Sequence, residues 1–228
     1  MDRSVRIKLS VMMFLQYFVW GAWGVAIGTY LLSLPTQGGL NFSGNLTGWI
    51  GAAIPIGAMI SPLFIGLIAD RLFSTEKVLA VLHLVGAALL VWAAYTCAQG
   101  FPEIESAFNG QAKEEKVGTG TLLDALDRQK SLQTDINKAS GTEKEELEKR
   151  LKEFNTENEK LIQEAVTRVN ESAVVSGAVT RLFWPFMWIM VAYSLCYMPT
   201  LTLTNSISFR NLSNPDKQFG SIRVLGTI

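Results

Sequence analysis

Long stretches without a single charged side chain constrain this chain more than any other feature of its sequence. Four of them contain at least 21 residues, and a further apolar segment begins near Phe219 and runs to Ile228. A helix needs about 20 apolar residues to cross the roughly 30 Å hydrocarbon core of a bilayer. The sequence therefore predicts four membrane helices and the start of a fifth. The four uncharged stretches are residues 9–34, 46–69, 78–98 and 182–209.

The charged residues are concentrated in one segment. Residues 101–180 contain 16 acidic and 11 basic side chains, which is 27 of the 40 in the chain. A soluble globular domain spreads about 25% charge along its whole length, so this distribution argues against one. The zero net charge and lack of a basic block give no footprint for nucleic acid. Two cysteines in 228 residues also argue against a secreted disulfide scaffold.

The chain thus divides into membrane helices at 1–98, a polar and mostly helical insert at 99–181, and further membrane helix at 182–228. The first uncharged stretch exceeds the 7–15 residues of a signal peptide and ends without a small-x-small cleavage site, so we expect it to be retained. Lysine and arginine in short loops place the N-terminus and the second-to-third and fourth-to-fifth connections in the cytoplasm, and the insert outside. The basic residues that carry this prediction are Arg3, Arg6, Lys8, Arg71, Lys77, Arg210 and Lys217.

The insert is predicted to be a helical hairpin. Thr142 and Glu145 have the spacing of a capping box, and residues 139–141 form a natural turn. Apolar residues follow at coiled-coil-like spacing, with a weaker helical pattern upstream. Two interpretations remain open, a solvated spacer and a docking arm for an extracytoplasmic protein partner. The apolar positions are Leu147, Leu151, Phe154, Leu161 and Ala165, and, upstream, Leu122, Leu126, Leu132 and Ile136.

An aromatic stripe with an amide runs along the first membrane helix. Gln16, Trp20, Trp23, Ile27 and Tyr30 are spaced by 4, 3, 4 and 3 residues, which places them on one helical face. Glutamine is costly against lipid, so this face should point into a bundle or cavity. The stripe suits either a platform for a planar ligand or an ordinary packed interface. Glycines on adjoining faces, at 21, 24 and 28, are predicted to let another helix approach closely.

The fourth membrane helix contains Pro185 and Pro199 and ends in hydroxyl and amide side chains that include Asn205. Proline leaves backbone carbonyls that need other partners, which is tolerated where a helix lines a cavity. In the fifth segment, Arg223 either extends to the cytoplasmic surface or faces the bundle, where its planar group of five donors suits polar ligands.

Four stretches of the sequence resemble a known family of membrane proteins. They are FLQYFVWGAWGVAIGTYL (14–31), GLIADRLFSTEKVLAVLHLVGA (66–87), YMPTLTLTNSISF (197–209) and IRVLGTI (222–228). With their flanks they cover everything except the insert, and they resemble the N-terminal half of a nucleoside:proton symporter of the major facilitator superfamily. Gly66, Asp70 and Arg71 resemble that superfamily's conformational motif between helices two and three. Residues 72–74 lack the glycine and paired basic residues that usually follow, a departure this symporter subfamily shares.

The resemblance implies an all-α membrane protein, here a partial N-terminal helix bundle with an external helical-hairpin insertion. It implies proton-coupled nucleoside uptake by alternating access across the plasma membrane, the inner membrane of a bacterium, with no cofactor or metal. Arg223 and Thr227 match positions that line the nucleoside site in the family, and the stripe residues Gln16, Trp20 and Trp23 with Asn205 complete the expected site. The family has twelve helices in two halves, so we expect the chain to be partial.

Other functions are less compatible with the residues. The apolar segments contain no acidic pair, nucleophile–base set or metal-ligand cluster, which argues against an enzyme. A membrane-anchored scaffold that recruits a partner through the insert, and a transporter of sugars or other small polar solutes, remain as alternatives. Within the membrane runs His83 is the one mid-run titratable candidate for proton coupling, although the coupling carboxylate is expected in the other half. Cys97 and Cys196 should lie about 21 Å apart along the helices and be free thiols.

Overall fold

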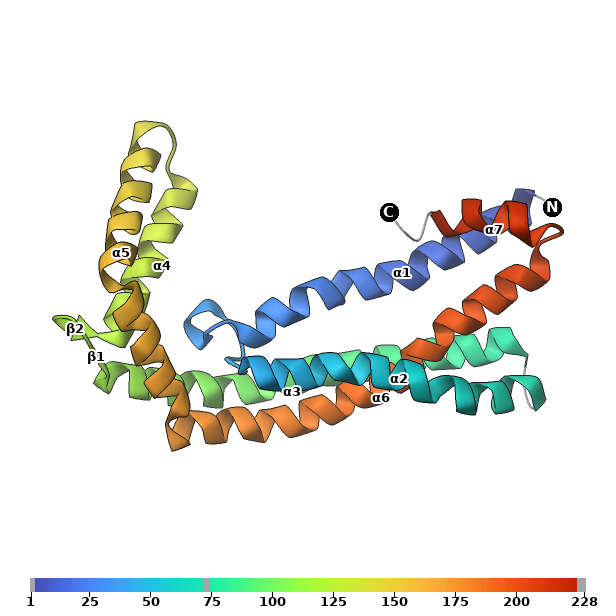
Figure 1. The fold of residues 1–228 in the computed structure, drawn as a ribbon, viewed down its shortest axis with the longest axis horizontal. Helices are drawn as coiled ribbons and strands as arrows, with labels where there is room; N and C mark the ends of the chain where they lie inside the picture. Colours follow the sequence, from blue (N-terminus) through green and yellow to red (C-terminus); the bar gives the residue numbers. More distant parts are fainter. Residues whose placement is uncertain (1–2, 72–73, 225–228) are drawn as a thin grey trace. The chain divides into compact units, whose positions relative to one another are not determined.

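The computed structural model describes residues 3–71 and 74–224; within its helices, the side chains at 62–71, 216, 217 and 221 fall outside the description. The described chain is almost entirely helical, as predicted (Figure 1). The elements are α1 (Arg3–Leu32), the 3-10 helix η1 (Pro35–Gln37), α2 (Gly44–Arg71), α3 (Thr75–Glu114), β1 (Lys116–Val117), β2 (Gly120–Thr121), α4 (Leu122–Lys138), α5 (Thr142–Glu171), α6 (Ala173–Asn211) and α7 (Pro215–Arg223).

The chain forms two compact units. Unit 1 contains residues 1–32, 42–97 and 183–228, and unit 2 contains residues 33–41 and 98–182. The boundaries between the units fall inside α3 and α6. Both helices continue beyond their uncharged stretches, because charged residues end a membrane-spanning segment without ending the helix. Loop residues 33–41 belong to the same unit as the polar insert.

Three helices in the described part of the chain are long and apolar enough to cross a membrane, namely α1, α3 and α6. Together with the uncharged 46–69 stretch of α2, they make this a multi-pass, all-α membrane protein. The last described helix, α7, begins at Pro215, four residues before the predicted start of the fifth segment. Proline is favoured at the first helical position because its fixed φ suits a helix and its missing N–H would have had no partner there.

The core of unit 1 includes a cluster where α1, α6 and α7 meet. Ile222 of α7 is buried against Leu9 and Met13 of α1, and α7 lies alongside the N-terminal part of α1 (Figure 1). Phe219 stacks on Phe209 with ring centroids 4.4 Å apart. This apolar contact packs α7 against the bundle. The cluster is completed by Ile207 and Leu212, with Val5, Met12, Tyr17 and Leu79 partly buried around it.

The connection between α1 and α2 is a tight turn that depends on glycine. Gly38 has φ of +81°, a left-handed conformation that most residues avoid, and its N–H bonds to the Pro35 carbonyl at 2.9 Å. A side chain on Gly39 would overlap the Ser33 carbonyl oxygen, which lies 2.3 Å from the ideal Cβ position. Lys130 Nζ of α4 donates to the Thr36 carbonyl at 2.7 Å, which ties the turn to the insert within unit 2.

Helices α4 and α5 pack as an antiparallel hairpin (Figure 1), and their connecting turn occupies residues 139–141 as predicted. The predicted capping box at Thr142 is wrong, because Gly141 is the N-cap and no side chain caps α5. A true capping box instead starts α4, where Thr121 and Asp124 exchange hydrogen bonds.

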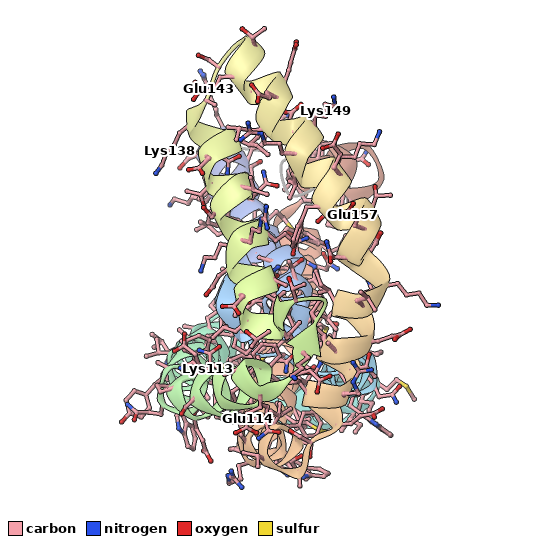
Figure 2. All side chains as sticks on the ribbon, turned by 90° about the vertical axis from the view of Figure 1, so that its left-hand side faces the viewer. Lys113, Glu114, Lys138, Glu143, Lys149 and Glu157 are labelled. Atoms are coloured by element: carbon pink, nitrogen blue, oxygen red, sulfur yellow. The ribbon has the colours of Figure 1, made fainter. Side chains whose placement is uncertain are left out.

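The seam between α4 and α5 was partly misassigned by the sequence pattern. Leu161 is 45% exposed, whereas its neighbour Ile162 is 8% exposed and faces the core with Ala165. Charged side chains project outward from both helices (Figure 2). Ion pairs at four-residue spacing on α5 link Glu146 with Arg150 and Lys144 with Glu148, which favours a solvated surface.

Candidate functional site

The side chain of Gln16 is the centre of a polar contact between α1 and α6. It is 3% exposed, so its amide must find partners inside the protein. Its Nε2 donates to Thr200 Oγ1 at 2.7 Å, and its Oε1 accepts from Thr204 Oγ1 at 3.2 Å. Its backbone carbonyl accepts from the Tyr197 hydroxyl at 2.5 Å. The prediction that this face points into the bundle is confirmed at Gln16, whereas Tyr30 at the other end of the stripe is 38% exposed.

The hydroxyl groups on α6 also bond within their own helix. Thr200 Oγ1 donates to the Tyr197 carbonyl at 2.5 Å, and Thr204 Oγ1 to the Thr200 carbonyl at 2.6 Å. One turn further, Ser208 donates to the Thr204 carbonyl at 2.9 Å. Thr200 therefore accepts from Gln16 while it donates within α6, whereas the single O–H of Thr204 is shared between the Gln16 Oε1 and the Thr200 carbonyl.

Four aromatic rings from α1 and α6 form a continuous cluster next to this amide. Trp20 stacks on Tyr197 with centroids 6.0 Å apart and planes 15° apart, and Tyr197 stacks on Tyr193 at 5.5 Å. Trp23 meets both Trp20 and Tyr193 edge-on, and its Nε1 donates to the Tyr193 hydroxyl at 3.2 Å. These offset and edge-to-face arrangements are the favoured ones for aromatic pairs.

The cluster is buried on its α6 side and half-buried on its α1 side. Tyr193 and Tyr197 are buried, while Trp20 and Trp23 keep part of their indole surface accessible. An accessible indole face held in such a cluster can stack a planar ring. We refer to Gln16, Trp20, Trp23, Tyr193 and Tyr197 as the aromatic–amide cluster.

Close helix approach in unit 1 comes from glycines on α2 and α3 rather than α1. An ideal Cβ on Gly57 would lie 2.1 Å from Ser194 Oγ, so only glycine lets α2 come this near α6. Gly86 of α3 faces the Tyr193 ring, with 3.6 Å between the ideal Cβ and the nearest ring carbon. The expectation for α1 is wrong in the described part of the chain, since Gly21 and Gly28 meet nothing within 4 Å and the nearest atoms to Gly24 belong to Trp20 of its own helix.

The other predicted site residues take no part in the hydrogen bonds of Gln16, or they lie outside the residues that the structure describes. Asn205 is half-buried on α6 next to Thr204, and Arg223 is exposed in the last turn of α7. Thr227 lies outside the described residues. The proposed motif residues Gly66, Asp70 and Arg71 lie on the helical backbone of α2, and their side chains are outside the description.

The sequence reasoning missed the α6 half of the cluster. Tyr193, Tyr197, Thr200 and Thr204 are spaced by 4, 3 and 4 residues, the same spacing as Gln16, Trp20, Trp23 and Ile27 on α1. Two polar-aromatic stripes of equal period were therefore present in the sequence, and pairing them would have identified the contact.

A groove on the other side of Gln16 separates α1 from α3. Its volume is about 650 Å³, and His83 lines it half-buried. The ring nitrogen Nδ1 of His83 lies 3.0 Å from the Leu79 carbonyl oxygen of its own helix. The remaining lining residues are Ile7, Lys8, Val11, Met12, Leu15, Gln16, Val19 and Leu79.

Cys97 and Cys196 are both free thiols, as predicted. Among residues 3–71 and 74–224, no three histidine, cysteine or acidic side chains lie where they could hold a metal ion together.

A family model described as "Nucleoside H+ symporter" matches residues 3–103 and 159–228 of the chain. The matched residues include α1, α2, α6 and α7, and the uncovered residues, 104–158, lie in unit 2. No solved structure shows a significant match to the chain.

Three curated relatives are similar to this chain. The protein named "Putative nucleoside transporter YegT" of Escherichia coli (strain K12) is 30% identical over 221 residues, 97% of this chain and 31% of that protein. The xanthosine permease of the same strain is 38% identical over 91 residues, 40% of this chain and 21% of the permease. The nucleoside permease NupG of that strain is 31% identical over 91 residues, with the same two shares. The chain thus spans less than a third of the length of each relative.

Proposed function

The chain belongs to the nucleoside H+ symporter family, and from this we propose that the native-length protein takes up nucleosides across a bacterial inner membrane together with protons. The three relatives are transporters by name, two for nucleosides and one for xanthosine, which supports transport rather than catalysis. In this proposal the helices rock between inward-open and outward-open states around a substrate site near the middle of the membrane.

The observation that carries the proposal is the aromatic–amide cluster. A nucleoside joins a flat base to a ribose with hydroxyl groups, so its site needs an aromatic face and neutral hydrogen-bonding groups. The half-buried indoles of Trp20 and Trp23 offer the face, and the hydrogen bonds of Gln16 hold α1 at a fixed distance from α6. Asn205, half-buried on α6, adds an amide for the ribose or the base edge. Base–aromatic stacking contributes about 1–3 kcal/mol per base.

Transport of radiolabelled uridine tests this proposal. Proteoliposomes with the native-length protein should exchange external labelled uridine for internal unlabelled uridine, and an excess of nucleosides should compete while sugars should not. Trp20→Ala should weaken apparent affinity about 5- to 150-fold, the equivalent of 1–3 kcal/mol. Trp188→Ala is the matched control, because this tryptophan of α6 is 63% exposed and outside the cluster. Competition by sugars alone would favour the alternative solute class instead.

Arg223 and Thr227 are proposed to contact the substrate by their correspondence to family positions. Arg223→Lys keeps the charge but removes the planar donor array, so apparent uridine affinity should fall at least tenfold, about 1.4 kcal/mol. Thr227→Ala should cost about 0.5–1.5 kcal/mol, as expected for one neutral hydrogen bond. Arg210→Lys is the control, since Arg210 pairs with Glu76 at 2.6 Å and a lysine can keep that pair. Equal transport by both lysine variants would remove Arg223 from the site.

The motif at Gly66, Asp70 and Arg71 is proposed to link helix ends during the conformational change. Asp70→Asn should slow uridine exchange without altering the affinity for uridine. A lowered affinity at an unchanged maximal rate would count against a conformational role.

We place the N-terminus in the cytoplasm and the insert on the outer side. The supporting pattern is the lysine and arginine bias of the short loops. A single cysteine at Ser140, in the exposed turn between α4 and α5, should react with a membrane-impermeant maleimide in intact cells. Reaction only after permeabilisation would reverse the proposed orientation. The same outer location would leave the insert accessible to an extracytoplasmic protein partner.

A further inference from the structure

The chain contains one histidine, and it lies inside a membrane helix. His83 is eight residues from the start of α3 at Thr75, about 12 Å along the helix axis at 1.5 Å per residue. Histidine is the side chain whose ordinary charge change falls between pH 5 and 8. An ionisable residue within a membrane segment is costly unless it has a function or a partner.

The hydrogen bond of His83 determines which ring nitrogen can bind a proton. The Leu79 carbonyl oxygen, 3.0 Å from Nδ1, can only accept a hydrogen bond, so Nδ1 carries the hydrogen. In the neutral ring, Nε2 then has the lone pair. The backbone bond therefore orients the imidazole and leaves Nε2 as the proton acceptor.

Among the described residues that line the groove, none besides His83 and Lys8 is charged or titratable, and none is a carboxylate. Lys8 of α1 is the other ionisable side chain that lines the groove. On α3, Glu76 pairs with Arg210 of α6 at 2.6 Å and Lys77 lies six residues before His83. On α7, which packs near Leu79, Arg223 is exposed. Among these described residues, the charged group that shares the groove with His83 is Lys8, and no carboxylate there forms an ion pair with the imidazole.

The groove connects His83 to the contact between α1 and α6. Gln16 lines the same groove, and its amide forms the hydrogen bonds to Thr200 and Thr204. A positive charge that forms in the groove therefore changes the electrostatic environment of the amide that joins the two helices. This is a direct physical route from proton binding to the aromatic–amide cluster.

We infer that Nε2 of His83 binds the proton that moves with the nucleoside; this inference rests on the proposed function. On the outer side Nε2 accepts one proton and the neutral imidazole becomes an imidazolium. After the conformational change the same N–H bond breaks, the proton leaves to the cytoplasm, and the neutral ring is restored. One proton crosses per cycle, and His83 undergoes no net change.

Two substitutions separate proton binding from a structural role. In His83→Asn the side-chain amide can still donate to the Leu79 carbonyl, but no titratable nitrogen remains. In His83→Gln the amide extends toward the position of Nε2. If His83 binds the proton, both variants lose coupling; if it acts only through the bond to Leu79, His83→Asn retains coupling. Tyr95→Phe on the exposed face of α3 is the matched control.

The measurements are made on cells that express the native-length protein at equal membrane levels. In a weakly buffered suspension, adding uridine should make the medium more alkaline with wild-type protein and Tyr95→Phe. With both His83 variants this change should fall at least tenfold, while uridine exchange at equal internal and external pH stays within about twofold of wild type.

Other results of these two measurements would contradict either the role of His83 or the proposed transport itself. Alkalinisation at the wild-type level by His83→Asn excludes His83 as the proton site. Loss of uridine exchange by both variants also overturns the inference, because His83 would then be needed for carriage of the nucleoside itself. If wild-type protein exchanges uridine without any alkalinisation, proton coupling itself is refuted. If wild-type protein exchanges no uridine, the proposed nucleoside transport fails first.

Discussion

The hydrogen bond between Gln16 and Thr200 should contribute measurable coupling energy to the association of α1 with α6. The test is a double-mutant cycle with Gln16→Leu and Thr200→Val, two replacements of similar size that leave no large cavity. Gln16→Leu removes the 2.7 Å bond to Thr200 and the 3.2 Å bond to Thr204. Thr200→Val removes the acceptor of the first bond only.

The magnitude follows from interhelical hydrogen bonds measured in membranes, which average about 0.6 kcal/mol and reach about 1.7 kcal/mol. Two such bonds give about 1–2 kcal/mol of destabilisation for Gln16→Leu. The two threonine hydroxyls add little to this loss, because without the amide each can donate to a carbonyl of α6. We expect the double variant to be less destabilised than the sum of the single variants by about 0.6–1.7 kcal/mol.

The assay is the free energy of unfolding of the native-length protein, measured by denaturant titration in lipid–detergent micelles. The control cycle combines Gln16→Leu with Thr96→Val, since Thr96 bonds within α3 to the Trp92 carbonyl at 2.9 Å. That pair should be additive within about 0.3–0.5 kcal/mol. A coupling between Gln16 and Thr200 no larger than the control would refute the claim that this bond links the helices.

Three further predictions concern positions elsewhere in the chain. Gly57→Val should strongly destabilise unit 1 and impair membrane insertion, because a side chain there overlaps Ser194; stable expression with unchanged thermal unfolding would contradict this. Asp124 accepts hydrogen bonds from the capping threonine, which lowers the pKa of its carboxyl. The resulting stabilisation of α4 is present above the ordinary carboxyl pKa of about 4 and is lost as the pH falls through the lowered pKa. The helix content of the wild-type protein should therefore show an additional transition at acid pH that is missing from Asp124→Ala. Leu161→Glu should change the free energy of unfolding by no more than about 0.5 kcal/mol, whereas Ile162→Glu, at a buried position, should lower it several times more. Equal effects would mean that Leu161 belongs to the seam, as its spacing in the sequence predicted.

The sequence predicted the membrane helices well because their signal is local. An uncharged run of the right length is a property of neighbouring residues, and the bilayer forces such a run to be helical. Helix ends were less accurate for the same reason. The third uncharged stretch stops at residue 98, but α3 continues to Glu114, since charged residues leave the membrane without leaving the helix.

The α1 face of the candidate site was also predictable, because the spacing of Gln16, Trp20 and Trp23 follows the helical period. Its partners Tyr193 and Tyr197 were not identified, although their spacing was equally regular. A stripe shows which face of a helix is special, but which helix it meets depends on packing between segments about 180 residues apart. The structure supplies that pairing through the bond from Tyr197 to the Gln16 carbonyl.

The capping motifs show how a correct rule can be applied at the wrong position. Thr142 and Glu145 have the right spacing, but Gly141 before them adopts φ of +62° and takes the N-cap position. Asp124 completes a capping box with Thr121, although glutamate or glutamine is the more typical residue at that position. Local geometry at the glycine, rather than the motif, decided where α5 begins.

The hydroxyls of α6 have acceptors in their own helix, which lowers the cost of separating them from α1. When a buried hydrogen bond between helices breaks, both groups normally lose a partner, but the O–H groups of Thr200 and Thr204 can each donate to a carbonyl of α6. The amide of Gln16 and the hydroxyl of Tyr197, which donates to the Gln16 carbonyl, must then find new partners, which water or a ligand hydroxyl can supply. A gap of a few kcal/mol leaves a minor state populated at 0.1–10%. A separation of α1 from α6 that costs no more than this would be reached by thermal motion alone.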